Sequence, residues 1–278
     1  MRLLMTMLVR DEADILDENI RFHLANGVDY ILILDNLSTD ATAEIANRYV
    51  RSGHAHYEFQ PNDIYAQSRW VTAMARRAYT EFGADWVINS DADEFWLPRH
   101  GSLKDVLSDV PAGIDVVTAE RSNFVPRHEH GEPFWKRMDV RWVSSCNALG
   151  DPLPPKAAHR GRDDVEVAFG NHAATFGGVQ PESHQAEIDI LHFPVRTRRQ
   201  YENKIVNGAQ ALANNHELPP EIGRTWRQLY ECCKNGDFQR VWERECLSES
   251  DVAAGLALGT LVRDERLMRA LDTAVAHK

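Results

Sequence analysis

Three carboxylates lie within four residues of one another, just after a short apolar run. The stretch Ala84–Trp96 reads ADWVINSDADEFW, so Asp91, Asp93 and Glu94 follow the hydrophobic residues directly. Burying such a cluster is costly unless positive charge compensates it, and the charge we expect first is a divalent cation that also holds a phosphate. We therefore predict that Asp91 and Asp93 bind Mg²⁺ or Mn²⁺ and a nucleotide diphosphate, with Glu94 in support. The alternative is a solvated acidic turn with Asp91 as a helix cap.

Two other polar clusters follow apolar runs near the N-terminus. Asp35 ends one such run, where its carboxylate could accept a hydrogen bond from the base or ribose of a nucleotide; an Asx turn, with Asp40 capping the next helix, is the structural alternative. Arg10 and Glu12 follow the first run. We predict that Arg10 contacts a phosphate and that Glu12 contacts the nucleotide. The alternative is that both are solvent-exposed charged residues of a loop.

A histidine near the end of a late apolar run could complete a metal site. His192 lies in the sequence Leu-His-Phe-Pro, and a basic helical stretch that includes Lys204 follows it. We predict His192 as a further metal ligand and Lys204 as a diphosphate contact. The structural alternatives are a packed core histidine and a solvated basic helix face.

The first third of the chain alternates strand and helix patterns. Apolar runs at 3–9, 30–34, 55–59 and 86–88 alternate with helical spacing at 14–26, 41–50 and 65–82. This order predicts an α/β fold with a mostly parallel sheet flanked by helices. Such sheets bind ligands at the carboxyl ends of their strands, where the three polar clusters lie.

The rest of the chain is less regular. We predict a strand at 116–119, loops and an antiparallel ribbon over 126–164, a strand at 188–193, a helix at 197–214, and helices over 217–278 with breaks near 219–220 and 235–236. We place a domain boundary at residue 215, with 1–215 as the sheet domain and 216–278 as a helical extension packed on it. The helical spacing of Val252–Leu271 would cover that domain or form a homodimer contact.

Composition narrows the function classes. The 278 residues carry a formal net charge of −11, which argues against nucleic acid as a partner. No apolar run approaches the roughly 20 residues that span a bilayer. The N-terminal run has no cleavage site, and the four cysteines form no CxxC pair. We therefore expect a cytoplasmic protein with reduced thiols, with peripheral contact to the inner face of the membrane as a further option.

Several stretches resemble family-2-like glycosyltransferases of the GT-A fold, and most closely the bacterial branch related to glycosyltransferase family 92. The opening is similar at 7–16 and 23–29, the loop at 34–40 matches their DN-x-S-x-D segment, 86–95 matches their W-x-x-x-x-D-x-D-E-F segment, and His192, Lys204 and Gly208 match their late H…K…G stretch. Asp11 departs from the pattern, because an asparagine is usual there.

The resemblance implies transfer of a sugar from a UDP- or GDP-sugar to an acceptor hydroxyl on a carbohydrate or a lipid-linked glycan. It places Asp35 near the nucleotide, and Asp91 and Asp93 near the metal and diphosphate. The catalytic base is open: Asp163, Asp164 and Glu166 are candidates. A nucleotidyltransferase that makes nucleotide-sugars is one rival, although no glycine-rich loop follows the first strand. A non-catalytic nucleotide- or sugar-binding protein is the other.

Overall fold

The computed structural model describes residues 1–129, 131–219 and 221–276. The chain forms two compact units, each assembled from separate stretches. One unit contains Met1–Asn62, Ala66–Arg121 and Pro154–Ile190, and the other contains Asp63–Tyr65, Ser122–Leu153 and Leu191–Lys278. The domain boundary expected at residue 215 stays a prediction.

Four parallel strands form one half of an eight-stranded sheet. They are β1 (Leu3–Val9), β2 (Tyr30–Asp35), β3 (Ala55–Phe59) and β4 (Trp86–Asp91), in the order β3-β2-β1-β4. The apolar side chains of β1 are buried on both faces, which explains its unbroken hydrophobic run. All four strands confirm the sequence prediction, and β4 continues three residues further than predicted, to Asp91.

The sheet continues through strands that the sequence revealed less well. The order beyond β4 is β8 (Lys156–Arg160), β6 (Val116–Asn123), β11 (Ser183–His192) and β5 (Glu94–Pro98). Strand β8 runs antiparallel to both β4 and β6. The prediction of loops and a ribbon over 126–164 is therefore wrong for β8. Its Lys-Ala-Ala-His-Arg sequence is too polar to read as a central strand until the partners of those polar groups are known.

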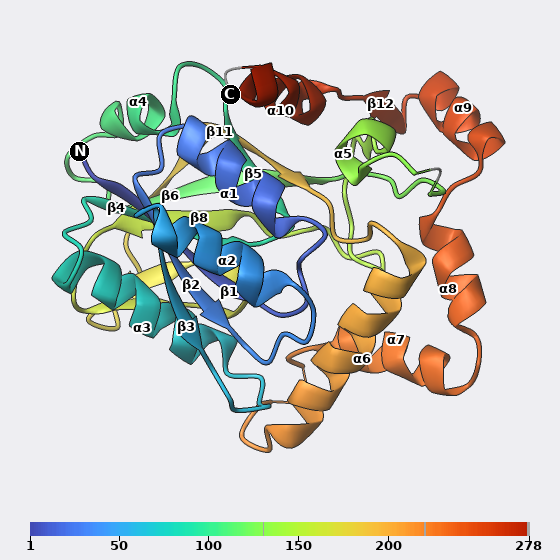
Figure 1. Cartoon of the computed structure of the whole chain (residues 1–278), viewed down its shortest axis with the longest axis horizontal. Helices are drawn as coiled ribbons and strands as arrows, with labels where there is room; N and C mark the ends of the chain where they lie inside the picture. The colour runs from blue at the N-terminus through green and yellow to red at the C-terminus, as the bar shows by residue number, and fades with distance from the viewer. Residues whose placement is uncertain (130, 220, 277–278) are drawn as a thin grey trace. The chain divides into compact units, whose positions relative to one another are not determined.

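Helices connect and cover the parallel strands. They are α1 (Leu16–Ala25), α2 (Thr42–Arg51) and α3 (Gln67–Thr80), while the short α4 (Leu103–Ser108) packs against β5. Helix α1 contacts α2 and β5, and Figure 1 shows α1 and α2 side by side over the sheet. Helix α3 packs on β1 and β4 with its apolar face. The alternation confirms the predicted α/β class.

A small hairpin packs against α3. Its strands are β9 (Val165–Val167) and β10 (Ala174–Phe176), joined through the 3₁₀ turn Phe169–Asn171. The Arg76 guanidinium on α3 donates to the Val165 carbonyl at 2.8 Å. This hairpin directly follows β8, so its loop returns toward the carboxyl end of β4.

The second unit is mostly helical. Its elements are α5 (Phe134–Arg137), β7 (Val140–Trp142), α6 (Arg198–Asn214), α7 (Arg224–Lys234), α8 (Phe238–Glu245), α9 (Glu249–Leu258), β12 (Leu261–Arg263) and α10 (Arg266–Ala276). Tyr201, Ile205, Phe238 and Trp242 share one of its apolar cores. Thr197 precedes α6, and its side chain caps the N-terminus of the helix by accepting a hydrogen bond from the Gln200 N–H. The helix therefore begins close to its predicted start.

The helical pattern predicted over Val252–Leu271 is interrupted. Helix α9 ends at Gly259, which adopts a left-handed conformation with φ +71°, and β12 then pairs antiparallel with β7. The predicted break near 235–236 is confirmed between α7 and α8, whereas Pro220 of the other predicted break lies outside the described residues. In the described part of the chain, every helix is too short or too polar to cross a bilayer.

Candidate functional site

The three polar clusters converge at one edge of the first unit. In the sheet register Val9 lies opposite Asp35, and Leu8 lies opposite Asp91, so the strand ends of β1, β2 and β4 are adjacent. The chain passes from β1 to β2 and β3 on one side, then returns to place β4 on the other side of β1. Open α/β sheets bind ligands at such a switch in strand order.

The acidic residues form a tight turn between two strands. Asp91 ends β4, Ala92 and Asp93 make the turn, and Glu94 begins β5. Beneath the turn, the Asn19 side-chain amide donates to the carbonyls of Ala92 and Glu94, both at 2.8 Å. These two hydrogen bonds fix the backbone that carries the carboxylates.

A buried histidine supports Asn19. Nδ1 of His23 lies 2.8 Å from the side-chain oxygen of Asn19, and Nε2 of His23 accepts a hydrogen bond from the Trp96 backbone N–H at 3.1 Å. Burial lowers the pKa of His23 to about 3, so the ring is neutral and able to accept that hydrogen bond.

Lysine 156 lies between two of the carboxylates. Its ammonium is 2.6 Å from the Asp91 carboxylate and 2.9 Å from that of Glu94, and the Arg121 guanidinium is 3.4 Å from Glu94. Burial alone would lower the pKa of Lys156, but Asp91 and Glu94 raise it above its ordinary value. The chain's own cations therefore compensate much of the acidic charge that the sequence analysis assigned to a metal ion.

The loop after β9 adds two polar side chains beside Asp91. The Asn171 amide nitrogen is 3.4 Å from Asp91, and Asn171 adopts a left-handed backbone with φ +60°. His172 Nδ1 lies 2.9 Å from the Pro155 carbonyl. Burial, and then the charges of Lys156 and Arg121, lower the pKa of His172 to about 4. It is therefore neutral near pH 7.

The sequence did not single out Lys156, Arg121 or Asn171. Lys156 lies on β8, which pairs with β4, Arg121 lies on β6, which pairs with β8, and Asn171 belongs to the hairpin loop. The one local signal for Lys156 is its place in the sequence Pro-Pro-Lys-Ala-Ala at 154–158, where a lysine begins a short run of small apolar residues.

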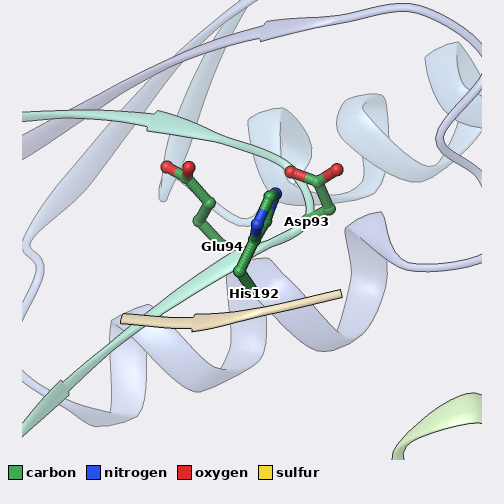
Figure 2. Close-up of side chains that lie close together, drawn as sticks. All are labelled: Asp93, Glu94 and His192. Carbon is green, nitrogen blue, oxygen red and sulfur yellow. The ribbon is translucent and has the colours of Figure 1, made fainter. Parts of the chain in front are cut away.

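A group of possible metal ligands forms around the acidic turn. Asp93, Glu94 and His192 are buried, and one ligand atom from each lies within 4.8 Å of the others. Figure 2 shows the His192 ring between the two carboxylates. Two carboxylates and an imidazole are a donor set that fits a divalent cation. Asp91 lies outside this group and pairs with Lys156, and its role as a metal ligand stays a prediction.

Asp35 is held by two hydrogen bonds. It is 1% exposed, accepts from the Ser38 backbone N–H at 2.9 Å, and accepts from the Tyr57 hydroxyl at 3.0 Å. Burial and this hydrogen bond raise the pKa of Tyr57 to about 12. The bond to Ser38 spans three residues, one more than an Asx turn, and ties Asp35 to the loop that follows β2. Asp40 accepts from the backbone N–H of Thr42, the first residue of α2.

The loop that carries Arg10 and Glu12 is tied to the loop after β2. Asp11 Oδ1 accepts from the backbone N–H of Thr39 at 2.6 Å and from its hydroxyl at 3.1 Å, while the Glu12 N–H donates to the Thr42 hydroxyl. Asp11 has φ +53°, a conformation that asparagine and aspartate tolerate. One oxygen makes both contacts to Thr39, so an asparagine could make them as well.

The candidates for the catalytic base lie near β9. Asp164 forms two contacts of 2.8 Å with the Arg162 guanidinium, which lowers the pKa of the Asp164 carboxyl. Glu166 is exposed and lies 3.7 Å from Arg76, and Asp163 is exposed beside Asp164. The arginine pairs give Asp164 and Glu166 structural tasks, and the assignment of the base stays a prediction.

The predicted diphosphate contact lies on α6 of the second unit. Lys204 is partly buried there, and its role stays a prediction. Arg196, in the same basic stretch, is fully buried and donates to the Phe193 carbonyl at 2.9 Å. Arg196 therefore holds the connection between β11 and α6.

Comparisons with solved structures find weak likeness spread over the chain. S. aureus TarS 1-349 in complex with UDP-GlcNAc is 10% identical, with 98% of this chain and 82% of that chain covered and a TM-score of 0.45. The mannosyltransferase PcManGT from Pyrobaculum calidifontis, in complex with GDP-Man and Mn²⁺, is 12% identical, with 99% and 86% covered and a TM-score of 0.43.

Glucosyl-3-phosphoglycerate synthase from Mycobacterium tuberculosis, in complex with Mn²⁺, UDP and phosphoglyceric acid, is 16% identical, with 57% of this chain and 55% of that chain covered and a TM-score of 0.33. A search of curated protein sequences finds no match. The sequence model of glycosyl transferase family 2 matches residues 7–141, a region that begins within β1, ends within β7 and includes the acidic turn. Over those residues, the match confirms the family-2-like resemblance seen in the sequence.

Proposed function

We propose that this protein is a hexosyltransferase that moves a sugar from a nucleoside-diphosphate sugar to an acceptor hydroxyl. The observation that carries the proposal is the family 2 match over residues 7–141, inside which the sheet gathers buried carboxylates at a switch in strand order. The donor is a UDP- or GDP-sugar, and the acceptor is a carbohydrate or a lipid-linked glycan. The expected location is the cytoplasm, with peripheral contact to the inner face of the membrane.

The residues at the strand ends would bind the donor. Asp35 would accept from the base or ribose, because Ser38 and Tyr57 hold its carboxylate in place. Arg10 would meet the diphosphate from the β1 loop, and Glu12 would contact the nucleotide. Lys204 would add a further positive charge to the diphosphate.

Asp93 and His192, with Glu94, would hold a divalent cation. A nitrogen ligand beside carboxylates suits Mn²⁺ better than Mg²⁺, which prefers oxygen alone. When bound, such an ion stabilises the negative charge on a departing nucleoside diphosphate. Lys156 would hold Asp91 and Glu94 in position, and Asp91 would face the donor.

The acceptor hydroxyl must lose a proton as it attacks the anomeric carbon. In an inverting reaction a carboxylate takes that proton, and the candidates are Asp163, Asp164 and Glu166. Separate Asp→Asn and Glu→Gln variants of these residues distinguish them, because loss of the base lowers kcat far more than the affinity for the donor.

The first test measures thermal stability with UDP, GDP and CMP, each with and without Mn²⁺. We expect one nucleotide to raise the melting temperature only when Mn²⁺ is present, and Asp93→Asn to abolish that response. Asp109→Asn, at the exposed end of α4, is the matched control. No metal-dependent response to any nucleotide would contradict the metal and donor assignments.

A second measurement separates the rival reactions. A glycosyltransferase releases a nucleoside diphosphate from a nucleotide-sugar, whereas a nucleotidyltransferase releases pyrophosphate from a nucleoside triphosphate and a sugar phosphate. Release of pyrophosphate alone would replace the proposal with the nucleotidyltransferase. Nucleotide binding with neither product would favour a non-catalytic binding protein.

A further inference from the structure

Three hydrogen bonds within the second unit hold Asn123, the last residue of β6. Its backbone N–H donates to the Ser145 hydroxyl at 2.8 Å, and its side-chain amide nitrogen donates to the Cys146 carbonyl at 3.1 Å. Its side-chain oxygen lies 2.6 Å from Nδ1 of His192. The Phe124 N–H also donates to the His192 carbonyl at 2.9 Å, which keeps the two strand ends together.

These contacts determine which way the Asn123 amide faces. A backbone carbonyl only accepts hydrogen bonds, so the amide NH₂ must face Cys146 and the amide oxygen must face His192. The amide oxygen also only accepts, so Nδ1 of His192 must carry the hydrogen. In the neutral ring the lone pair then belongs to Nε2.

We propose that Asn123 is a positioning residue that selects the Nδ1–H tautomer of His192 and so presents Nε2 to a divalent cation. The inference rests on the metal site of the proposed function, in which His192 joins Asp93 and Glu94. Metal-binding histidines usually donate their second ring N–H to a fixed acceptor, and loss of that acceptor weakens metal binding about 10- to 100-fold.

Nuclear magnetic resonance of the imidazole nitrogens tests the tautomer in the metal-free protein. We expect the wild type to show His192 with hydrogen on Nδ1, and Asn123→Leu to move the population toward the Nε2–H form. Asn123→Asp retains an acceptor oxygen and should restore the Nδ1–H form. A purely structural role would leave the tautomer unchanged in all three proteins.

Titration with Mn²⁺, followed by the electron paramagnetic resonance of the free ion, tests the consequence. We expect Asn123→Leu to weaken Mn²⁺ binding about tenfold or more, and Asn123→Asp to recover most of the loss. The matched control is Asn147→Ala. Asn147 accepts from the backbone N–H groups of Leu149 and Asp151 in the same loop, so its loss perturbs the loop without removing the His192 contact.

The two readouts separate two kinds of failure. An unchanged tautomer in Asn123→Leu, or unchanged Mn²⁺ affinity despite a changed tautomer, would overturn the role of Asn123. Absence of Mn²⁺ binding in the wild type would overturn the metal part of the proposed function as well, whatever the tautomer. Equal weakening in Asn147→Ala would show that loop structure, and not the Asn123 contact, is responsible.

Discussion

Lysine 156 illustrates how single side chains decide the chemistry of the acidic turn. Its side chain is 1% exposed, and its ammonium contacts the carboxylates of Asp91 and Glu94, of which Glu94 is fully buried. A buried carboxylate without a cation would take up a proton instead of staying charged. Lys156 therefore compensates negative charge at the acidic turn from within the chain itself.

Replacing Lys156 tests this directly. Lys156→Met leaves the buried carboxylate of Glu94 without its ammonium, and also removes that partner from the one-third exposed Asp91, so the free energy of unfolding should fall by about 3–5 kcal/mol. The control is Lys104→Met, which removes a partly exposed ammonium 2.6 Å from Asp29 and should cost about 1 kcal/mol or less. Chemical denaturation at pH 7 measures both. Similar losses in the two variants would refute the buried-pair argument.

A second residue prediction concerns the support beneath the turn. Asn19→Leu conserves volume but leaves the buried carbonyls of Ala92 and Glu94 without their donor, so unfolding free energy should fall by about 2 kcal/mol or more. Asn47→Leu, on the partly buried side of α2, loses one hydrogen bond to Ala43 and should cost far less. A neutral Asn19→Leu variant would mean that the turn does not depend on Asn19.

At the scale of elements, β8 is the strand that completes the site. It pairs antiparallel between β4 and β6, and it brings Lys156 to the acidic turn and His159 into the core. His159 Nδ1 lies 2.8 Å from the Arg160 carbonyl, while its Nε2 is a buried atom that has no hydrogen-bond partner in the described part of the chain. A strand this polar is stable in a sheet interior only while the imidazole stays neutral.

This predicts a loss of stability in acid. Burial lowers the pKa of His159 from 6.5 to about 4, so between these values the unfolded chain binds the proton and the folded chain does not. The unfolding free energy therefore falls as pH falls from 6.5 toward 4, by up to about 3 kcal/mol from this residue. The slope of unfolding free energy against pH reports how many protons the unfolded chain binds in excess of the folded chain. His159→Met should lower that number by about one, whereas His54→Gln on the surface should leave it unchanged. Denaturation series at pH 4.5, 5.5 and 7.5 supply the slopes.

For the molecule as a whole, strand order concentrates the functional loops of the first unit. The loops after β1, β2 and β4 meet at one edge, and hydrogen bonds from Thr39 to Asp11 and from Ala13 to Asp40 tie the first two together. This edge is preorganised before any ligand arrives. A donor nucleotide would then lose little free energy in ordering the loops.

Hydrogen exchange should show where the nucleotide binds. With saturating nucleotide and Mn²⁺, amides in the loops at 10–15, 36–41 and 92–93 should exchange more slowly. The loops before β2 and β4, at 26–29 and 83–85, lie at the amino ends of the strands and should not change. Equal protection at both edges would argue for general stabilisation, and protection at the amino ends alone would place the ligand elsewhere.

The sequence by itself determined the elements whose signals are local. Continuous apolar runs predicted β1 to β4, helical spacing predicted α1 to α3, and the acidic turn was visible as a motif, because each depends on neighbours within a few residues. It also indicated that the polar clusters meet at strand ends, because parallel crossovers require it.

Only the tertiary structure decided how the acidic charge is compensated. Lys156 lies 65 positions from Asp91 in sequence, and Arg121 lies 27 positions from Glu94, so no local pattern could pair them. The same holds for β8, whose polar residues gain partners only inside the sheet, and for Asn123, which faces His192 across 69 positions. Burial turns such distant polar pairs into strong constraints, since an unpartnered group is costly only where water is absent.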